Sequence, residues 1–326
     1  MSEDTIHQPN DKLLKATFSV PENACAFFQN HLPSDLADAL EWNSLTLEHC
    51  TFIDPQFASS ESDLLFHIKL HRSDAFLYLL FEHQSTEEPR MALRLLSYIV
   101  RIWERFAKSH APPAKLPAVL PIVLAQDKRP WKTSTRLEDL LDLPPAFAHV
   151  LRAWQPTLMY HLLELVRLPY ADITGTPEGI ITLRALKAQP MEELLEDVIW
   201  DEPLLFSIPE GALERILRYI LNADVNVSLL EERIAKIRSK PLQTKTMTLA
   251  DQLIQKGMQE GEQKGLSKGE LRAFRTAVLR ALEIRHGGYP EGIREAVEAI
   301  QDPAQLESLH EMAIRSDSLD AFAEKL

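Results

Sequence analysis

Cysteine is scarce in this chain, whose 326 residues include only Cys25 and Cys50. Two cysteines are too few for the disulfide framework of a small secreted domain or for a zinc–cysteine cluster. Cysteine-poor chains are typical of a reducing compartment, so we expect a cytoplasmic protein. The first residues, Met1–His7, are polar and acidic, and they lack the apolar core of a secretory signal.

Long apolar runs and an excess of basic charge are also missing. No uninterrupted apolar stretch approaches the length of a membrane span, so no membrane partner is expected. The net charge is −13 at pH 7, whereas a domain held on DNA by phosphate contacts is usually basic on at least one face. Any positive charge that binds DNA must therefore be local. The patterns G-x-x-x-x-G-K-[ST] and strand-linked G-x-G-x-x-G are absent, so no nucleotide cofactor is expected.

The composition that remains is that of a globular protein, 45% hydrophobic and 25% charged. The length suffices for two domains, or for one domain with a substantial extension. Near the amino terminus, helical patterns cover residues 10–31, a short helix is predicted over 34–42, and residues 44–48 alternate as a strand does.

Two apolar runs of strand length, residues 64–70 and 75–81, are separated by a short polar link and predict a β-hairpin. Asp63 precedes the first run, and Glu82-His83-Gln84 ends the second. The start of one hairpin strand lies beside the end of the other, so Asp63 is expected to face Glu82. Side chains two apart on a strand point the same way, which puts Glu82 and Gln84 on one face.

Three polar groups would thus converge at one end of an apolar hairpin, a geometry suited to a metal ion. Hard cations such as Mg²⁺ prefer carboxylate and carbonyl oxygens, so the expected ligands are Asp63, Glu82 and the backbone carbonyl of His83. The metal would activate a water molecule and neutralise charge on a phosphate, and Gln84 would position that water or contact the phosphate. The alternative is that Asp63 and Glu82 only mark where two strands leave the core.

Residues 90–110 predict a long helix that begins after capping hydroxyls and early acids. At about 100° per residue, its basic side chains fall within roughly 60° of one another. These side chains are Arg90, Arg94, Arg101, Arg105 and Lys108. The rest of the surface is largely apolar, which predicts a mostly buried helix with one basic stripe. The stripe is either a solvated edge or a surface that contacts DNA phosphates, and its position directly after the acid cluster favours phosphate contact.

Residues 116–125 are almost continuously apolar, as in a strand buried on both faces, and residues 158–166 predict another strand. The helices predicted farther along cover residues 137–141, 147–154, 180–187, 191–200, 210–221, 225–238 and the part from 242 onward. We therefore expect an α/β domain over residues 1–180, a helical extension over 181–241 and a charged helical region over 242–326.

Four glycines recur every fourth residue in the carboxy-terminal part, at Gly257, Gly261, Gly265 and Gly269. In a helix this spacing makes a drifting smooth stripe that another backbone could approach closely. Each glycine costs about 1 kcal/mol relative to alanine. The repeat is therefore either a surface for homodimerisation or a flexible linker between helices.

An acid, a hairpin, an E-x-[K/Q] pattern and a following helix resemble the PD-(D/E)XK nuclease superfamily. More specifically, the chain resembles the recombination-promoting nuclease (Rpn) family, which is also described as transposase-like. The segments that carry this resemblance are Asn10–Ser19, Glu61–Leu65, Phe81–Ser85, Leu93–Tyr98, Arg101–Arg105, Pro121–Leu124 and Arg129–Trp131. The glycine repeat also fits the tail of that family.

The resemblance implies a restriction-endonuclease-like core, which is a mixed central sheet flanked by helices. It also implies a DNA endonuclease that uses Mg²⁺, Ca²⁺ or Mn²⁺ on double-stranded DNA and promotes recombination or acts in mobile-element or defence biology. Asp63 and Glu82 carry over as metal ligands, and Asp11 carries over as a supporting acid. Gln84 replaces the lysine of the superfamily, so no cationic helper for water activation is expected at that position.

Three positions depart from the family pattern. Asn10 stands where histidine is usual, Leu14 where phenylalanine is usual, and Gln126-Asp127 where a His-Gly pair is common. The rival hypothesis is a catalytically degenerate nuclease fold that binds DNA or protein.

Overall fold

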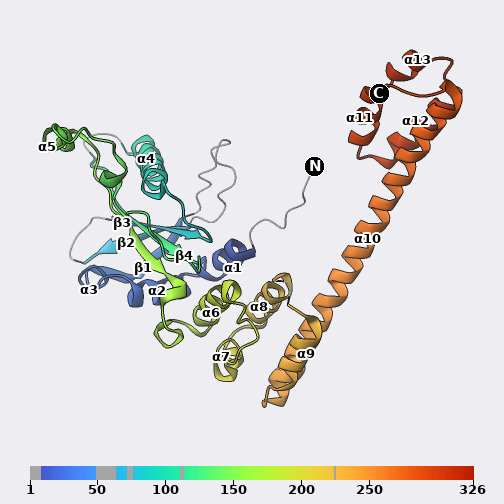
Figure 1. The fold of residues 1–326 in the computed structure, drawn as a ribbon. Helices are drawn as coiled ribbons and strands as arrows, with labels where there is room; N and C mark the ends of the chain where they lie inside the picture. Colours follow the sequence, from blue (N-terminus) through green and yellow to red (C-terminus); the bar gives the residue numbers. More distant parts are fainter. Residues whose placement is uncertain (1–8, 49–63, 72–75, 111–113, 224) are drawn as a thin grey trace. The chain divides into compact units, whose positions relative to one another are not determined.

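The computed structural model describes residues 9–48, 64–71, 76–110, 114–223 and 225–326 (Figure 1). The chain divides into two compact units, Met1–Ala250 and Asp251–Leu326. Among the helices in the described ranges, none is both long enough and apolar enough to cross a membrane.

The first unit contains the expected mixed α/β fold, built on a five-stranded sheet with the order β1-β2-β3-β4-β5. The strands are β1 (Leu40–Glu48), β2 (Leu64–Leu70), β3 (Phe76–Gln84), β4 (Ala118–Ala125) and β5 (His161–Glu164). The first three strands pair antiparallel, and β4 and β5 continue the sheet in parallel with β3. The carboxyl ends of β3, β4 and β5 therefore lie at the same edge.

The predicted hairpin is confirmed, because β2 and β3 pair from Leu64 opposite Phe81 to Lys69 opposite Phe76. Asp63, the residue directly before this register, lies outside the described residues. Its predicted position opposite Glu82 stays a prediction.

One face of the sheet is covered by α1 (Pro9–Phe18) and α2 (Pro21–His31). The ring of Phe81 on β3 lies 5.9 Å from that of Phe18 and 5.3 Å from those of Phe27 and Phe28. These side chains are completely or almost completely buried. Aromatic burial thus fixes the first two helices against the strand that ends in the Glu82-His83-Gln84 sequence.

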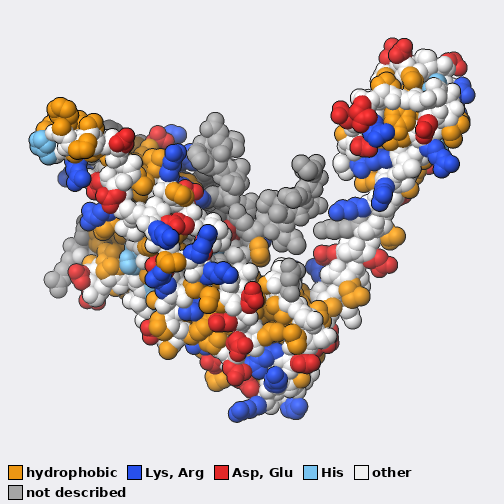
Figure 2. Space-filling view, viewed as in Figure 1, with side chains coloured by type: hydrophobic (Ala, Val, Ile, Leu, Met, Phe, Trp, Pro, Cys, Tyr) orange, Lys and Arg blue, Asp and Glu red, His pale blue; other side chains and the backbone are white. Residues whose placement is uncertain are grey.

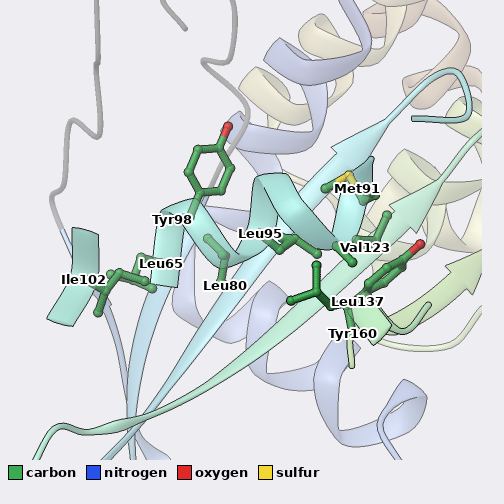
Figure 3. Close-up of a cluster of buried hydrophobic side chains, with 10 residues drawn as sticks. Leu65, Leu80, Met91, Leu95, Tyr98, Ile102, Val123, Leu137 and Tyr160 are labelled. Carbon is green, nitrogen blue, oxygen red and sulfur yellow. The ribbon is translucent and has the colours of Figure 1, made fainter. Parts of the chain in front are cut away.

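The opposite face of the sheet is covered by α4 (Met91–Ser109), which confirms the long helix predicted from the sequence. Figure 3 shows Met91, Leu95 and Ile102 of this helix beside side chains of the sheet, and Tyr98 belongs to the same buried cluster. Their spacing of three and four residues is the apolar face of an amphipathic helix.

The prediction that this helix is buried around most of its circumference is wrong for two residues, since Leu93 and Val100 are 47% and 40% exposed. Leu93 and Leu95 therefore offer a matched pair of substitutions. We expect Leu95→Ala, at a fully buried position, to lower the free energy of unfolding by about 2–5 kcal/mol, and Leu93→Ala to lower it by less than about 1 kcal/mol. Urea unfolding followed by tryptophan fluorescence measures both, and equal losses would contradict the packing described above.

Shorter helices complete the first unit. They are α3 (Ser34–Ala37), α5 (Ala148–Leu151), α6 (Pro177–Met191), α7 (Glu202–Ser207), α8 (Glu210–Asn222) and α9 (Val227–Ala235), together with 3₁₀ turns at Leu137–Leu140, Arg152–Trp154, Leu165–Arg167 and Tyr170–Asp172. Among them α6 contacts both α1 and α2.

Two predicted helices are corrected by the structure. The helix predicted over residues 34–42 ends at Ala37, because Leu40 pairs with Leu70 and begins β1. The helix predicted over residues 191–200 does not form. Instead α6 ends at Met191, Glu192 takes a left-handed conformation with φ of 62°, and turns bury Trp200, whose indole donates to the carbonyl of Leu194. At Leu40 a strand pairing made beyond the local segment overrides helical periodicity, and at residues 191–200 local turns replace the helix.

Helix α10 (Lys240–His286) crosses the boundary between the units, and the second unit continues with α11 (Glu291–Ala299), α12 (Pro303–Arg315) and α13 (Leu319–Ala323). Its core contains Val278, Leu282, Val297, Leu306 and Phe322. The expectation of a helical carboxy-terminal region is confirmed. All four repeat glycines lie within α10. Apart from the neighbouring residues and the nearby backbone of the helix itself, no described atom comes within 4 Å of the position that a Cβ would take at any of them.

Candidate active site at the end of strand β3

Glu82 and Gln84 lie on the same face of β3, as the alternation of strand side chains predicts. The amide nitrogen of Gln84 donates a hydrogen bond of 2.6 Å to Oε1 of Glu82. Leu80, two residues earlier, packs against α4, so both polar side chains belong to the face that α4 covers. The prediction that they share a face is confirmed.

Arg94 is the cation beside this carboxylate. Its guanidinium lies 2.8 Å from Oε1 of Glu82, and its Nε donates to the hydroxyl of Tyr98 at 3.0 Å. Arg94 and Tyr98 stand one helical turn apart on α4, so the tyrosine orients the guanidinium from the same helix. The Glu82 side chain is fully buried and that of Arg94 is 27% exposed. A buried carboxylate requires such a counter-charge, since an unpaired charge is costly to remove from water.

The second oxygen of Glu82 is different. Oε2 is buried and has no hydrogen-bond partner in the described part of the chain. A buried acceptor without a donor is unusual, and a carboxylate oxygen is a ligand that hard divalent cations prefer. Oε2 of Glu82 is therefore one atom that could serve as a ligand of such a cation. No group of three His, Cys, Asp or Glu side chains suited to a metal occurs among the described residues. Asp63, the other predicted carboxylate ligand, lies outside the described residues.

The side chain of His83 points to the other face of the sheet and is completely buried. Its Nδ1 lies 2.5 Å from Oδ1 of Asp11 on α1, and its Nε2 lies 2.8 Å from Oε1 of Gln126, the residue after β4. The amide nitrogen of Gln126 in turn donates to the carbonyl of Leu186 on α6 at 2.6 Å. One chain of hydrogen bonds thus ties together α1, β3, the end of β4 and α6.

This chain of bonds determines where a proton must lie. Because the Gln126 amide nitrogen donates to Leu186, its oxygen is the atom that faces His83, and Nε2 of His83 must donate to it. The other ring nitrogen faces a carboxylate oxygen of Asp11.

Two of the residues that depart from the family pattern belong to this polar region. The hydroxyl of Tyr219 on α8 donates to Oδ1 of Asn10 at 2.7 Å, and burial raises the pKa of Tyr219, which keeps the hydroxyl protonated. Gln126 is the partner of His83. Leu14 is fully buried in the core. These departures therefore have structural partners in this chain.

The predicted site residues fall into two groups. Glu82, Gln84 and Arg94 converge on the α4 face, whereas Asp11 lies on the opposite face with the His83 side chain. Asp11 therefore contacts His83 and not Glu82, and any support it gives to Glu82 passes through β3. The ligand role of the His83 carbonyl stays a prediction.

The five basic side chains of the α4 stripe differ in their exposure and partners. Arg94 is engaged with Glu82, Arg101 is half-buried, and Arg90, Arg105 and Lys108 are exposed. Their contact with DNA stays a prediction.

Sequence reasoning missed the pairing of Arg94 with Glu82 and the roles of the His83 side chain and Gln126. One signal was present for His83, since a polar residue between Glu82 and Gln84 on a strand must face the other way.

Comparison with known proteins gives a family and several relatives. Residues 8–200 match the model of a family described as putative transposase, YhgA-like. The chain is 34% identical over 134 residues to the recombination-promoting nuclease RpnD of Escherichia coli O157:H7, and the aligned region covers 40% of this chain and 51% of RpnD. It is 28% identical over 174 residues to the recombination-promoting nuclease RpnC of Escherichia coli K12, and this alignment covers 53% of each protein.

A third relative, the inactive recombination-promoting nuclease-like protein RpnE of Escherichia coli K12, is 27% identical over 283 residues, 81% of this chain and 87% of RpnE. Proteins named as nucleases and proteins named as inactive thus both resemble the chain. The alignments with RpnD and RpnC span about half the length of those proteins. No solved structure matches the chain.

Proposed function

Because the chain belongs to the YhgA-like family of putative transposases, we propose that it is a metal-dependent endonuclease acting on double-stranded DNA. The observation that carries this proposal is the buried carboxylate of Glu82, with one oxygen held by Arg94 and Gln84 and the other without a partner among the described residues. Its place at the carboxyl edge of the parallel strands is where ligands commonly bind in open α/β sheets. The proposal includes a restriction-endonuclease-like core.

In this proposal Asp63, Glu82 and the backbone carbonyl of His83 hold Mg²⁺, or Mn²⁺ or Ca²⁺ in its place. The cation, when bound, supplies positive charge at the attacked phosphate. Gln84 keeps the Glu82 carboxylate in one orientation through the 2.6 Å hydrogen bond. The oxygen of a water molecule forms a bond to phosphorus and the water gives up a proton. The bond to the leaving oxygen breaks, and that oxygen takes up a proton.

Arg94 supplies the positive charge that a lysine would carry at the position of Gln84. Its guanidinium compensates the charge of Glu82 and stands where negative charge increases as phosphate arrives. The Asp11–His83 pair supports the same strand from the opposite face. The residues of this chain thus orient the carboxylate and balance its charge.

The biological role we propose is the promotion of recombination, or mobile-element or defence activity, in the cytoplasm. RpnD and RpnC, which carry recombination-promoting nuclease in their names, support this role. We also propose a homodimer formed through the helical region over residues 242–326, since the repeat glycines leave open space along α10.

Plasmid cleavage tests the proposed activity. We expect the wild type to nick supercoiled DNA in Mg²⁺ or Mn²⁺, and Asp63→Ala and Glu82→Gln each to lower the rate by at least about 100-fold, because each removes a proposed metal ligand. EDTA should abolish the nicking. Equal nicking by the wild type and both variants would remove the activity from these residues.

A second candidate function is a DNA-binding module without catalysis. The observation that favours it is the ion pair itself, because Arg94 already occupies one oxygen of Glu82, and RpnE is named inactive. DNA binding without cleavage in any of the three metals would support this candidate.

A further inference from the structure

The loop that follows β4, residues 126–136, lies beside the candidate site. The backbone N–H of Gln126 donates to the carbonyl of Gln84 at 2.8 Å, which continues the parallel register between β3 and β4. The loop exposes four basic side chains within nine residues, Lys128, Arg129, Lys132 and Arg136. Chain connectivity and this hydrogen bond therefore place basic charge next to the end of β3.

The carboxylate of Glu87 holds one part of this loop. Oε1 of Glu87 accepts from the backbone N–H groups of Lys132 and Thr133 at 2.8 and 2.5 Å, and from the hydroxyl of Thr133 at 2.6 Å. The Thr133 hydroxyl, followed by these N–H groups, lowers the pKa of Glu87, so its carboxylate is charged at neutral pH. Glu87 lies only five residues after Glu82, in the segment that joins β3 to α4. The loop is thus fixed against that segment.

Trp131 anchors the loop from the other side. Its backbone N–H donates to Oε2 of Glu164 at the end of β5 at 2.9 Å, and its indole donates to the hydroxyl of Tyr160 at 3.1 Å. Burial raises the pKa of Tyr160 to about 12, so that hydroxyl keeps its proton. With Glu87 on one side and Trp131 on the other, the loop presents its charges from a constrained backbone.

The carboxylates near this loop are engaged, whereas two of its lysines are available. Asp127 has a side chain only 10% exposed and binds both the guanidinium and the backbone N–H of Arg129. Arg136 lies 3.9 Å from Glu138. Lys128 and Lys132 are exposed, and neither forms an ion pair with a carboxylate in the described ranges. Both side chains face solvent, and the charge of Lys132 also helps to lower the pKa of the Glu87 carboxyl.

We infer that Lys128 and Lys132 form a phosphate-binding surface for the backbone of nucleic acid beside Glu82 and Gln84. The inference rests on the proposed function. It also says where a protein with a net charge of −13 carries the local positive charge that DNA binding requires. A protein so acidic must concentrate its positive charge where phosphate binds. Arg94, a member of the α4 stripe, is committed to Glu82, and the loop supplies cations at the same edge of the sheet.

A second basic region provides the control. Figure 2 shows Lys and Arg side chains over the sheet near β4 and also where α9 meets α10. The second region includes Lys236 and Lys240, both exposed and in the same compact unit. Neither is linked by a hydrogen bond to the end of β3 among the described contacts. Exchanging two lysines for glutamates changes the net charge equally in either region.

The experiment measures binding of a fluorescent DNA duplex by anisotropy in EDTA, so that cleavage does not interfere, over a series of salt concentrations. We expect Lys128→Glu/Lys132→Glu to weaken binding about tenfold or more, and to lower the slope of log K against log salt by about 2. Lys236→Glu/Lys240→Glu should weaken binding less than about threefold. Thermal unfolding of each variant confirms that the fold is retained.

Equal weakening by the two double variants would overturn the inference, since it would reduce the effect to net charge. Wild-type binding by the loop variant, or no DNA binding by the wild type, would overturn it as well. The Glu82→Gln variant separates this inference from the proposed function. One outcome is that the wild type and Glu82→Gln bind DNA equally, that neither cleaves it, and that only the loop variant loses binding. The cleavage proposal then fails and the binding surface stands.

The other outcome is that the loop variant binds and cleaves DNA as the wild type does. The binding surface then fails and the cleavage proposal stands.

Discussion

Replacing Arg94 with alanine is expected to lower the rate of metal-dependent cleavage by about 100- to 1,000-fold, the range found when a preorganised donor at a reacting centre is removed. The reason is the environment of Glu82. Its carboxylate is fully buried, and the described neighbours that bind it are the Arg94 guanidinium and the neutral amide of Gln84. Without Arg94 no described side chain at hydrogen-bond distance offsets its charge.

The measurement is single-turnover cleavage of a labelled duplex, with added guanidinium as the decisive reagent. Guanidinium ions at millimolar concentration should restore part of the activity of Arg94→Ala, because they can occupy the vacated space and carry the same charge. Urea has a similar shape without the charge and should not restore it. Glu82→Gln is the matched control, since it should lose activity and respond to neither compound.

Two results would contradict this role for Arg94. A variant that cleaves as fast as the wild type would show that the ion pair is dispensable. A variant that cleaves faster would show that Arg94 blocks the carboxylate, as the second candidate function supposes. Arg94→Lys helps to distinguish charge from geometry, because lysine keeps the charge but cannot form the fork that binds Glu82 and Tyr98 together.

The parts of the fold that the sequence predicted are those that local periodicity determines. Alternating and continuous apolar runs located β2, β3 and β4, and helical periodicity located α4. The same reasoning placed Glu82 and Gln84 on one face, which their hydrogen bond confirms.

The contacts that were not predicted join residues far apart in the chain. Asp11 meets His83 across 72 residues, and Gln126 meets Leu186 across 60. Periodicity says which way a side chain points, but it does not say which element lies opposite. The first residues of β1 show the same limit, because Leu40 was predicted as helix and became strand by pairing with Leu70. Glu82 was expected from its spacing, whereas its cation came from a helix whose basic stripe was assigned to DNA.

The Asp11–His83 pair gives a second prediction of large effect, this time on stability. We expect Asp11→Ala and His83→Ala each to lower the free energy of unfolding by about 3 kcal/mol, because removing one side chain of this hydrogen-bonded pair leaves the other polar group without its partner inside the protein. The double variant should lose about as much as either single variant, which corresponds to a coupling energy of about 2–3 kcal/mol. Urea unfolding reports on this region directly, since all five tryptophans of the chain precede residue 201 and therefore lie in the first unit.

Thr17 and Thr182 provide the neutral comparison for this cycle. Their buried hydroxyls lie 2.9 Å apart and also join α1 to α6, but neither carries charge. Replacing both with valine should change stability by less than about 1 kcal/mol, because two hydrogen-bonding groups are removed together. If losses at Asp11 and His83 add without coupling, the contact between the two side chains contributes nothing to the fold. Strong coupling would instead mean that this contact holds α1 to β3, so the acid on one face of the sheet helps fix the strand that carries Glu82 on the other.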